Sequence, residues 1–343
     1  MKTMIESIRD TQDKILSKGD TILIGEGVCD PKAIFGSTSG LKDKHPDRVF
    51  ESPVSENAMT GVCIGASLNG MRAIHIHQRM DFMMYAMDQI INNAAKWWSM
   101  FGGKNGNVPI VIRCIIGRGW GQGNQHSQNL GYMFSGMPGL KVVYPSNADN
   151  ARGLLESAHE DPNPVIFIEH RWCHNLKSEV TDKKYELGKA RIARQGRDIT
   201  IIAWGYMVIE ALRAADFLSN IEIDCEVIDL QTTSHIDYNL FAESLRKTKE
   251  FLLVDDSWYN ASINNKIAVY VNSIAGEIKI RSGGRMQCHD FYAPATVGLI
   301  DGYYPDAYHI AKQILATFKK PYDPLTLKSE HPDIPDSTFK GPF

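Results

Sequence analysis

The chain has 343 residues, of which 43% are hydrophobic and 22% are charged, and its formal net charge is -3 at pH 7. This composition is typical of a soluble globular protein with room for two domains. The small negative charge gives no reason to expect a nucleic acid or an anionic membrane as a partner.

The amino-terminal stretch MKTMIESIRDTQDKILSKGD mixes acids and bases, as an amphipathic helix does, and lacks the apolar centre of a signal peptide. No apolar stretch approaches the roughly 20 residues that span a bilayer. The six cysteines form no C-x-x-C pair, and Cys63, Cys114 and Cys225 lie in apolar runs. These are features of buried thiols in a reducing compartment, so we expect a cytoplasmic protein.

Short β-branched runs alternate with helix-length amphipathic segments along the chain. Strands are predicted at 21–25, 72–77, 109–115, 140–145, 164–169, 198–204, 223–230, 250–256 and 277–282. Helices are predicted at 84–101, 147–159, 206–219, 237–247, 259–273 and 305–317. Alternating βα units predict an α/β fold with two domains, each rich in parallel sheet.

A charged segment, 175–197, interrupts this alternation and places a domain boundary near residue 190. The predicted organisation is therefore a first domain at 1–190, a second at 191–320 and a proline-rich tail at 321–343. The tail lacks apolar periodicity, and we expect it on the surface.

The stretch SPVSENAM puts the carboxylate of Glu56 directly before a run of small and apolar residues. One interpretation is a helix start, where an acid interacts favourably with the positive end of the helix dipole. The other is a proton relay with a cofactor. The stretch alone favours the helix start.

The glycine-rich GRGWGQGN, residues 117–124, follows a predicted strand. It fits neither G-x-G-x-x-G nor G-K-[ST], so it predicts a loop that lines a cleft and not a phosphate-binding loop. His126 follows it among polar and small residues, where a structural and a catalytic role are equally compatible with the local sequence. The histidine pairs are His75 with His77 and His170 with His174. Neither pair has a third metal ligand at a spacing typical of a metal site.

Taken together, several blocks resemble the β subunit of thiamine-diphosphate-dependent 2-oxo acid dehydrogenases. In chain order they are IGEGV, RVFESPVSENAMTGVCIGASLNGMRAI, MDFMMYAMDQIINNAAKW, HSQ, PGLKVVYPSNADNARGLL, DPNPVIFIEH, ITIIAWGYMVIEALRAA and EVIDLQTTSHID. The resemblance covers residues 3–318. It implies a transketolase-like pyrimidine-binding domain followed by a transketolase C-terminal-like domain.

The resemblance also implies a cofactor and a partner. In this family, one subunit binds the aminopyrimidine ring of thiamine diphosphate, and an α subunit holds the diphosphate and Mg²⁺ through a G-D-G…N motif. This chain contains no G-D-G. It is therefore expected to form half of an active site in an α2β2 assembly.

Site residues follow from the resemblance by position. The glutamate that exchanges a proton with the pyrimidine nitrogen N1′ falls on Glu56, and it must be buried enough to stay protonated part of the time. The stacking aromatic residue falls on Phe82, the polar pyrimidine contact on Gln78, the apolar contact on Val54 and the active-site histidine on His126. A structural K⁺ site found in some members would use Ile110, Val111, Ala158, Asp161 and Asn163.

Two departures from the family pattern leave the substrate and acceptor open. QRMDF replaces the usual Q-F-A-D-[FY] and puts Arg79 and Met80 beside the cofactor contacts. DDSWYNAS, residues 255–262, replaces an E-E…G-G region, which puts docking onto a lipoyl acyltransferase in question.

The leading interpretation is a 2-oxo acid dehydrogenase-type subunit that forms a C2-enamine from a 2-oxo acid. The alternative is a carboligase or split transketolase-like subunit acting on a ketose in specialised sugar or natural-product metabolism. A further alternative is an inactive structural partner of an α subunit.

Overall fold

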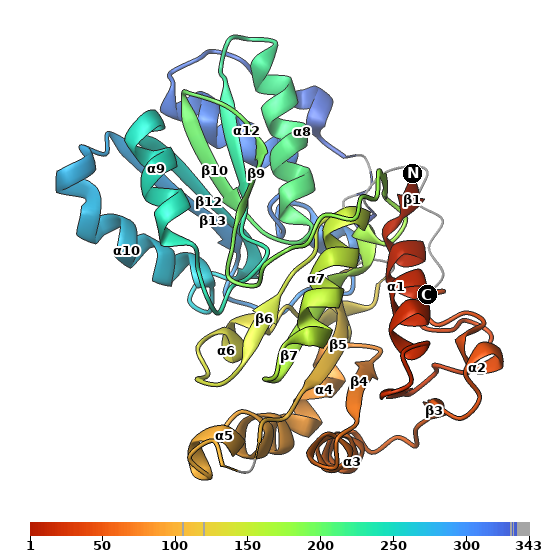
Figure 1. Cartoon of the computed structure of the whole chain (residues 1–343). Coiled ribbons are helices and arrows are strands. Elements are labelled where there is room, and N and C mark those ends of the chain that lie inside the picture. The colour runs from red at the N-terminus through yellow and green to blue at the C-terminus, as the bar shows by residue number, and fades with distance from the viewer. Residues whose placement is uncertain (105, 119–120, 330, 332, 335–343) are drawn as a thin grey trace. The chain divides into compact units, whose positions relative to one another are not determined.

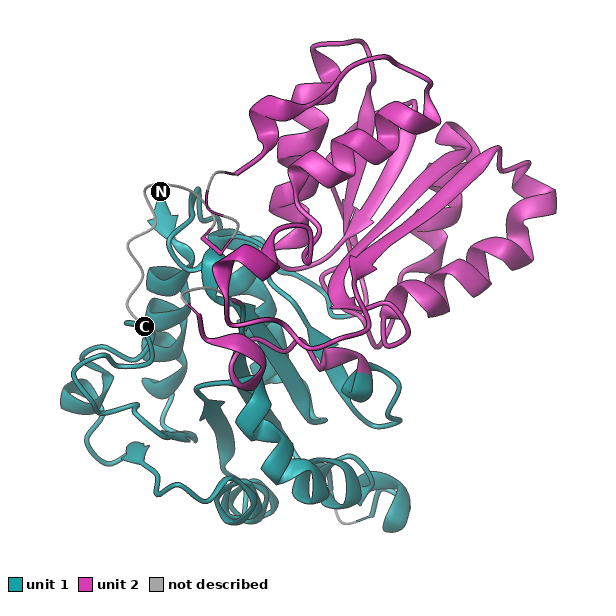
Figure 2. Cartoon of the chain, turned by 180° about the vertical axis from the view of Figure 1, so that it is seen from behind, with its two compact units in different colours: residues 1–117, 133–187, 342 teal, residues 118–132, 188–341, 343 magenta. Residues whose placement is uncertain are grey.

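The computed structural model describes residues 1–334 apart from 105, 119–120, 330 and 332. These residues form two compact units, shown in two colours in Figure 2. Unit 1 contains residues 1–117 and 133–187, and unit 2 contains residues 118–132 and those from 188 onward. The loop 118–132 therefore groups with the second unit although unit 1 residues flank it on both sides, which a linear division of the sequence does not anticipate.

Unit 1 is built on a six-stranded sheet in the order β3-β2-β4-β5-β7-β6, in which every neighbouring pair is parallel (Figure 1). Its strands are β2 (Thr21–Gly25), β3 (Val49–Glu51), β4 (Arg72–His77), β5 (Ile110–Ile116), β6 (Lys141–Val143) and β7 (Val165–His170). Every residue of β5 and β7 is buried, as expected for parallel strands with both faces covered.

The helices of unit 1 include α1 (Met4–Leu16), α2 (Leu41–Lys44), α3 (Glu56–Leu68) and α7 (Ala148–Glu160), and α6 (Gly131–Ser135) crosses the boundary between the units. Helix α1 packs against α7. It begins with a capping box, in which the Thr3 hydroxyl accepts from the Glu6 amide and the Glu6 carboxylate accepts from the Thr3 amide. A two-stranded antiparallel pair, β1 (Lys2–Thr3) with β8 (Lys177–Ser178), and the short turn η4 (Arg171–Cys173) complete the unit.

The predicted helix 84–101 is helical but irregular. It follows α4 (Met80–Met83) as a 3₁₀ turn, η1 (Met84–Ala86), a π-helix, η2 (Asp88–Ala94), and a short α-helix, α5 (Trp97–Met100). Ile90 and Ala94 point into the core, but Trp98 and Phe101 of the same apolar face are exposed, so the apolar periodicity identifies the buried face only in part. It cannot reveal which carbonyl each amide bonds, and that choice separates α from π geometry.

Unit 2 is built on a five-stranded sheet in the order β13-β12-β10-β11-β9, in which only β9 is antiparallel to its neighbour. Its strands are β9 (Arg191–Arg194), β10 (Ile199–Ala203), β11 (Cys225–Asp229), β12 (Glu250–Trp258) and β13 (Ser282–Cys288). Its helices are α8 (Met207–Ser219), α9 (Tyr238–Thr248), α10 (Ile263–Ile278), α11 (Val297–Ile300) and α12 (Ala307–Thr317), with short turns at η3 (Gly123–Gln125) and η5 (Leu325–Leu327).

The predicted strand 277–282 is wrong. Helix α10 continues to Ile278, Lys279 ends it in the left-handed conformation with φ 61°, and β13 begins only at Ser282. The apolar alternation of EIKIRS is the last turn of an amphipathic helix followed by its cap. The other predicted strands and helices are present with small shifts of their ends, and the α/β class with two sheet-based units is confirmed.

Charged groups in the core of unit 1 are paired with one another. Arg113 of β5 donates from Nε and Nη2 to the two carboxylate oxygens of Glu169 on β7, at 2.6 and 2.9 Å. Gln12 of α1 and His174 complete this network, and both charged side chains are fully buried. Within the described residues, no helix is both long enough and apolar enough to cross a bilayer.

Candidate functional site

Loops that follow the parallel strands of unit 1 converge at the C-terminal edge of its sheet, where α/β folds bind ligands. Glu26 follows β2, and its carbonyl oxygen accepts a hydrogen bond from Nε2 of Gln78, which follows β4, at 3.0 Å. Gly27 has φ +72°, and a Cβ there would lie 2.2 Å from Nε2 of Gln78. A glycine is therefore required for Gln78 to reach this loop.

Glu56 is the first residue of α3, so its position at a helix start is confirmed. Its side chain is partly exposed in this chain, which differs from the buried acid that proton exchange with a pyrimidine requires. Glu56 also acts on Glu26: burial, and then the negative charges of Glu56 and Glu51, raise the pKa of Glu26. The carboxyls of Glu26, Glu51 and Glu56 are thus near enough to one another to interact.

The side chains of the remaining predicted cofactor contacts are accessible. Val54 is 82% exposed, Gln78 is exposed, and Phe82 on α4 is partly exposed. In contrast, the residues that flank Gln78, His77 and Arg79, are buried. Helix α3 packs against β4 and η1, which brings the element carrying Glu56 to the strand that precedes Gln78 and Phe82.

Arg79 turns inward from this group. Its guanidinium lies 5.7 Å from the ring centroid of Phe35, and that of Arg171, after β7, lies 4.6 Å from the same centroid. Burial lowers the pKa of Arg79 to about 10, and burial together with the charge of Arg79 lowers the pKa of Arg171 to about 10. Two buried cations therefore give this end of the sheet a positive potential.

His126 lies in unit 2, directly after the turn η3, and it is partly exposed. The other four predicted site residues belong to unit 1. The predicted site is thus divided between two units, with the aminopyrimidine contacts in one and the histidine in the other.

The residues assigned to K⁺ lie at the opposite, N-terminal edge of the unit 1 sheet. They are Ile110 and Val111 at the start of β5, Ala158 and Asp161 at the end of α7, and Asn163 before β7. The Asp161 carboxylate forms an ion pair with Lys141, and the Asp161 carbonyl accepts from Nη1 of Arg72 at 3.2 Å. A potassium ion would compete with these two cationic side chains, so the residues as arranged fit such a site poorly. No cluster of three or more His, Cys, Asp or Glu side chains suited to a metal occurs in the described part of the chain.

Sequence reasoning missed Glu26, whose carbonyl and carboxyl both take part in the cluster. Its only signal is an acid placed directly after a buried strand, in IGEGV. It also missed Asn129 and Asp256, which form a hydrogen bond within unit 2 across 127 positions of sequence.

Comparisons with known proteins bear on the two domains and on the fold of the chain. The model of the transketolase pyrimidine-binding domain matches residues 1–174, and that of the transketolase C-terminal domain matches residues 188–310. The two matches meet where the chain passes from unit 1 to unit 2.

Curated relatives match most of the chain. The β subunit of acetoin:2,6-dichlorophenolindophenol oxidoreductase from Cupriavidus necator is 39% identical over 313 residues, which cover 89% of this chain and 92% of that protein. The pyruvate dehydrogenase E1 β subunit from Rickettsia conorii is 36% identical, with 78% of this chain and 83% of that protein covered. A mitochondrial pyruvate dehydrogenase E1 β subunit from Oryza sativa subsp. japonica is 37% identical, with 78% and 73% covered.

A solved structure described as a split-gene transketolase, an inactive β4 tetramer, matches the fold with a TM-score of 0.74. It covers 94% of this chain and 98% of the matched chain at 20% sequence identity. At this identity the likeness establishes the fold.

Proposed function

Because the chain belongs to the family of E1 β subunits of thiamine-diphosphate-dependent 2-oxo acid dehydrogenases, we propose that it supplies half of an active site. The aminopyrimidine ring of the cofactor would bind at the C-terminal edge of the unit 1 sheet. The observation that carries this proposal is the link of the accessible Gln78 and Glu56 to Glu26 at this edge. The accessible Val54 and Phe82 lie close to Glu56 and Gln78 in the sequence. These side chains suit an aminopyrimidine, since they offer a carboxyl for N1′, an amide for the exocyclic amine, and apolar and aromatic surfaces for the ring.

The same observation supports a partner subunit. Val54 is 82% exposed and Glu56 is partly exposed, although a carboxyl that shares a proton with a ring nitrogen has to be shielded from water. An α subunit seated over this edge would provide that shielding. It would also hold the diphosphate and Mg²⁺, in an α2β2 assembly.

Each residue then has a defined task. When bound, thiamine diphosphate supplies a nucleophilic thiazolium carbon that adds to the substrate carbonyl and accepts the electron pair left by departing CO₂. Glu56 holds the proton that its carboxyl shares with N1′, Gln78 and Phe82 orient the pyrimidine ring, and Glu26 holds Gln78 in place through its carbonyl. His126 exchanges a proton with the substrate-derived oxygen.

The proposed donor is a 2-oxo acid. The C. necator relative carries acetoin in its name, which makes an α-hydroxyketone the second donor class to test. The alternative function is a carboligase or split transketolase-like subunit with a ketose donor. The positive potential that the buried Arg79 and Arg171 give this sheet edge suits the carboxylate of a 2-oxo acid, and it suits a ketose only if the sugar carries an anionic group. A lipoyl acyltransferase, an aldehyde and an artificial oxidant are the acceptors that distinguish these reactions.

The first test is the variant Glu56→Gln in a complex with an α subunit. We expect 2-oxo-acid-dependent reduction of 2,6-dichlorophenolindophenol to fall by about 10²–10⁴-fold, because the amide cannot share a proton with N1′. Assembly measured by size-exclusion chromatography should be unchanged. Glu243→Gln, on the exposed face of α9, is the matched control and should retain full activity.

Two results would contradict the proposal. One is wild-type activity of Glu56→Gln, which would remove the carboxyl from the mechanism. The other is tight, Mg²⁺-dependent binding of thiamine diphosphate by this chain alone, measured by calorimetry, which would mean that the site is not divided between two subunits.

A further inference from the structure

The loop 118–132 carries His126 and lies in unit 2. The partly buried carboxylate of Asp256 interacts with residues near both ends of that loop. Nδ2 of Asn129, near the loop's C-terminal end, donates to Oδ1 of Asp256 on β12 at 2.6 Å. At the other end, the positive charge of Arg118 acts on the same carboxyl. The Arg118 guanidinium lies 3.8 Å from the ring centroid of Tyr304, which itself packs beside Asp256.

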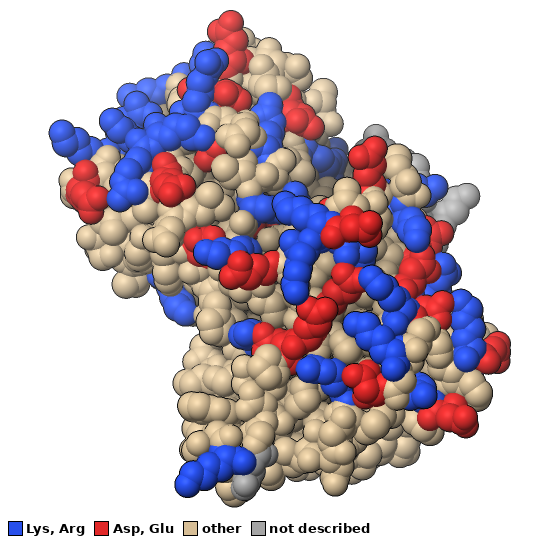
Figure 3. All heavy atoms as spheres, in the orientation of Figure 1, with Lys and Arg blue, Asp and Glu red and all other residues tan. Residues whose placement is uncertain are grey.

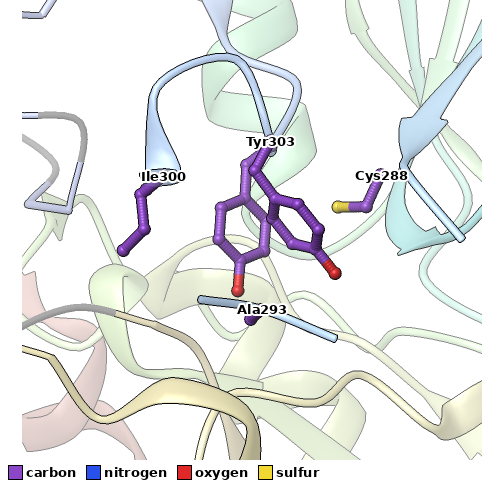
Figure 4. Close-up of a cluster of buried hydrophobic side chains, with 5 residues drawn as sticks. Cys288, Ala293, Ile300 and Tyr303 are labelled. Carbon is purple, nitrogen blue, oxygen red and sulfur yellow. The ribbon is translucent and has the colours of Figure 1, made fainter. Parts of the chain in front are cut away.

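Asp256 lies beside a buried cluster of unit 2. Cys288, Ala293, Ile300, Tyr303 and Tyr304 form a buried cluster in unit 2, in which the tyrosine rings and the Cys288 side chain lie together (Figure 4). Sγ of Cys288 donates to the backbone oxygen of Asp256 at 3.3 Å. Ser127, Gln128 and Asn129 line a small cavity together with Asp256 and Tyr304, so the residues that follow His126 pack directly against this cluster.

The N-terminal part of the loop also lies close to unit 2. Gly123 has φ +61°, and a Cβ there would lie 3.1 Å from Cβ of Ala295. Gly121 has φ +71°, and a Cβ there would lie 3.3 Å from the carbonyl oxygen of Ala295. Gly121 and Gly123 therefore allow a close approach of the loop to Ala295, which is a different task from the phosphate binding that such glycines suggest.

We propose that Asp256 is a positioning residue, which fixes the His126 loop onto unit 2 by binding Asn129 directly and attracting Arg118. This inference rests on the proposed function only in its last step, where the position of His126 matters for turnover. A charge-assisted hydrogen bond at one end of the loop and a buried cation over an aromatic ring at the other define the loop's path.

The neighbouring carboxyl, Asp255, provides a matched control on the same strand. It is fully buried, whereas Asp256 is partly exposed, and it accepts from the hydroxyl of Ser262 at 2.6 Å and from the amide of Ser257 at 3.2 Å. Ser262 caps α10 by accepting from the Asn264 amide. Asp255 thus supports the start of α10, and no described contact links it to the loop.

The experiment compares Asp256→Ala, Asp256→Asn, Asn129→Ala and Asp255→Asn in the complex with the α subunit. Hydrogen exchange of peptides from 121–131 is the first readout. We expect exchange there to accelerate about tenfold in Asp256→Ala and Asn129→Ala, because a hydrogen bond to a charged group is lost. Asp256→Asn keeps an acceptor for Asn129 and should lie between Asp256→Ala and wild type, whereas Asp255→Asn should leave the loop unchanged.

Turnover is the second readout. In Asp256→Ala we expect kcat to fall by about 10–100-fold with little change in KM for the 2-oxo acid, as misplacement of a catalytic group does. The double variant His126→Ala/Asp256→Ala should be no slower than His126→Ala, since Asp256 acts through the histidine loop.

The two readouts separate the two proposals. Wild-type exchange of the loop in both Asp256→Ala and Asn129→Ala would overturn the positioning role, whatever the activity. Additive losses in the double variant would also overturn it. Wild-type turnover by His126→Ala would instead remove the histidine from the proposed function. The hydrogen-exchange result would then still test whether Asp256 positions the loop. If Asp256→Ala does not fold, hydrogen exchange of the loop in Asn129→Ala and Asp256→Asn tests the positioning role instead.

Discussion

Asp255 and Asp256 are adjacent carboxyls in different surroundings, since Asp255 is fully buried and Asp256 is partly exposed. Burial, and then the negative charge of Asp256, raises the pKa of Asp255 to about 7. Burial also raises the pKa of Asp256, but the hydrogen bond from Asn129 and the charge of Arg118 oppose this rise. Burial therefore favours the protonated form of Asp255, whereas the donor and the cation that face Asp256 favour its charged form.

This arrangement predicts a pH dependence of stability. The unfolded pKa of an aspartate is about 3.9, so the folded chain binds more protons between about pH 4 and pH 7, and the free energy of unfolding falls as pH rises through that window. Asp255→Asn mimics the protonated acid and should remove this slope. Relative to wild type, the variant should therefore be less destabilised at pH 8 than at pH 5 in urea denaturation. Equal effects at both pH values would show that Asp255 does not hold the proton.

At the scale of secondary structure, the Arg113–Glu169 pair joins β5 to β7 in the centre of the unit 1 sheet. Burial opposes the charge on Glu169, but Arg113 and the hydrogen bond with His174 dominate and lower its pKa to about 2. Removing one partner would leave the other charge buried without compensation, which costs about 3–5 kcal/mol.

We therefore expect Glu169→Gln to lower the free energy of unfolding by about 3–5 kcal/mol, measured by urea denaturation at pH 7. The double variant Arg113→Met/Glu169→Leu should recover most of this loss, because it removes both charges. Lys184→Ala, which breaks the exposed pair with Glu160, should leave the unfolding midpoint unchanged. A double variant less stable than Glu169→Gln would mean that packing, and not charge, dominates at this position.

The sequence predicts those strands and helices whose burial produces a recognisable pattern of apolar residues. TILIG and RAIHIH are recognisable because both faces of a parallel strand are covered. Strand β13, SGGRMQC, is not recognisable from its sequence. A Cβ on Gly283 would lie 2.1 Å from the Phe251 ring, so this position of the strand requires glycine, a residue that is rare in strands.

The candidate site is less predictable from local sequence. The stretch around Glu56 alone favours a helix start, and only the resemblance across many blocks assigns it a catalytic role. The bond between Asn129 and Asp256 leaves no local signal, since it joins two polar residues in different sequence contexts.

For the whole molecule, the distribution of surface charge bears on assembly. In Figure 3, charged side chains are dense over unit 2 and over the α1 and α7 side of unit 1, whereas the region over α3 and α5 is largely uncharged. The exposed apolar side chains of α3 and of the segment 84–101 are Val62, Tyr85, Trp98, Met100 and Phe101. A continuous uncharged region that carries exposed aromatic residues is typical of a surface buried by a partner.

We accordingly expect Val62→Glu to weaken assembly with the α subunit by at least about tenfold, because burying one uncompensated carboxylate costs more than about 1.4 kcal/mol. Val62 is 53% exposed on α3, so the glutamate is accommodated in the isolated chain and its thermal unfolding should not change. Val269→Glu on α10 is the matched control, since Val269 is a 73% exposed helical valine of unit 2. Native mass spectrometry across a concentration series measures both complexes. Undiminished assembly of Val62→Glu, or equal weakening by Val269→Glu, would place the subunit interface on another part of the surface.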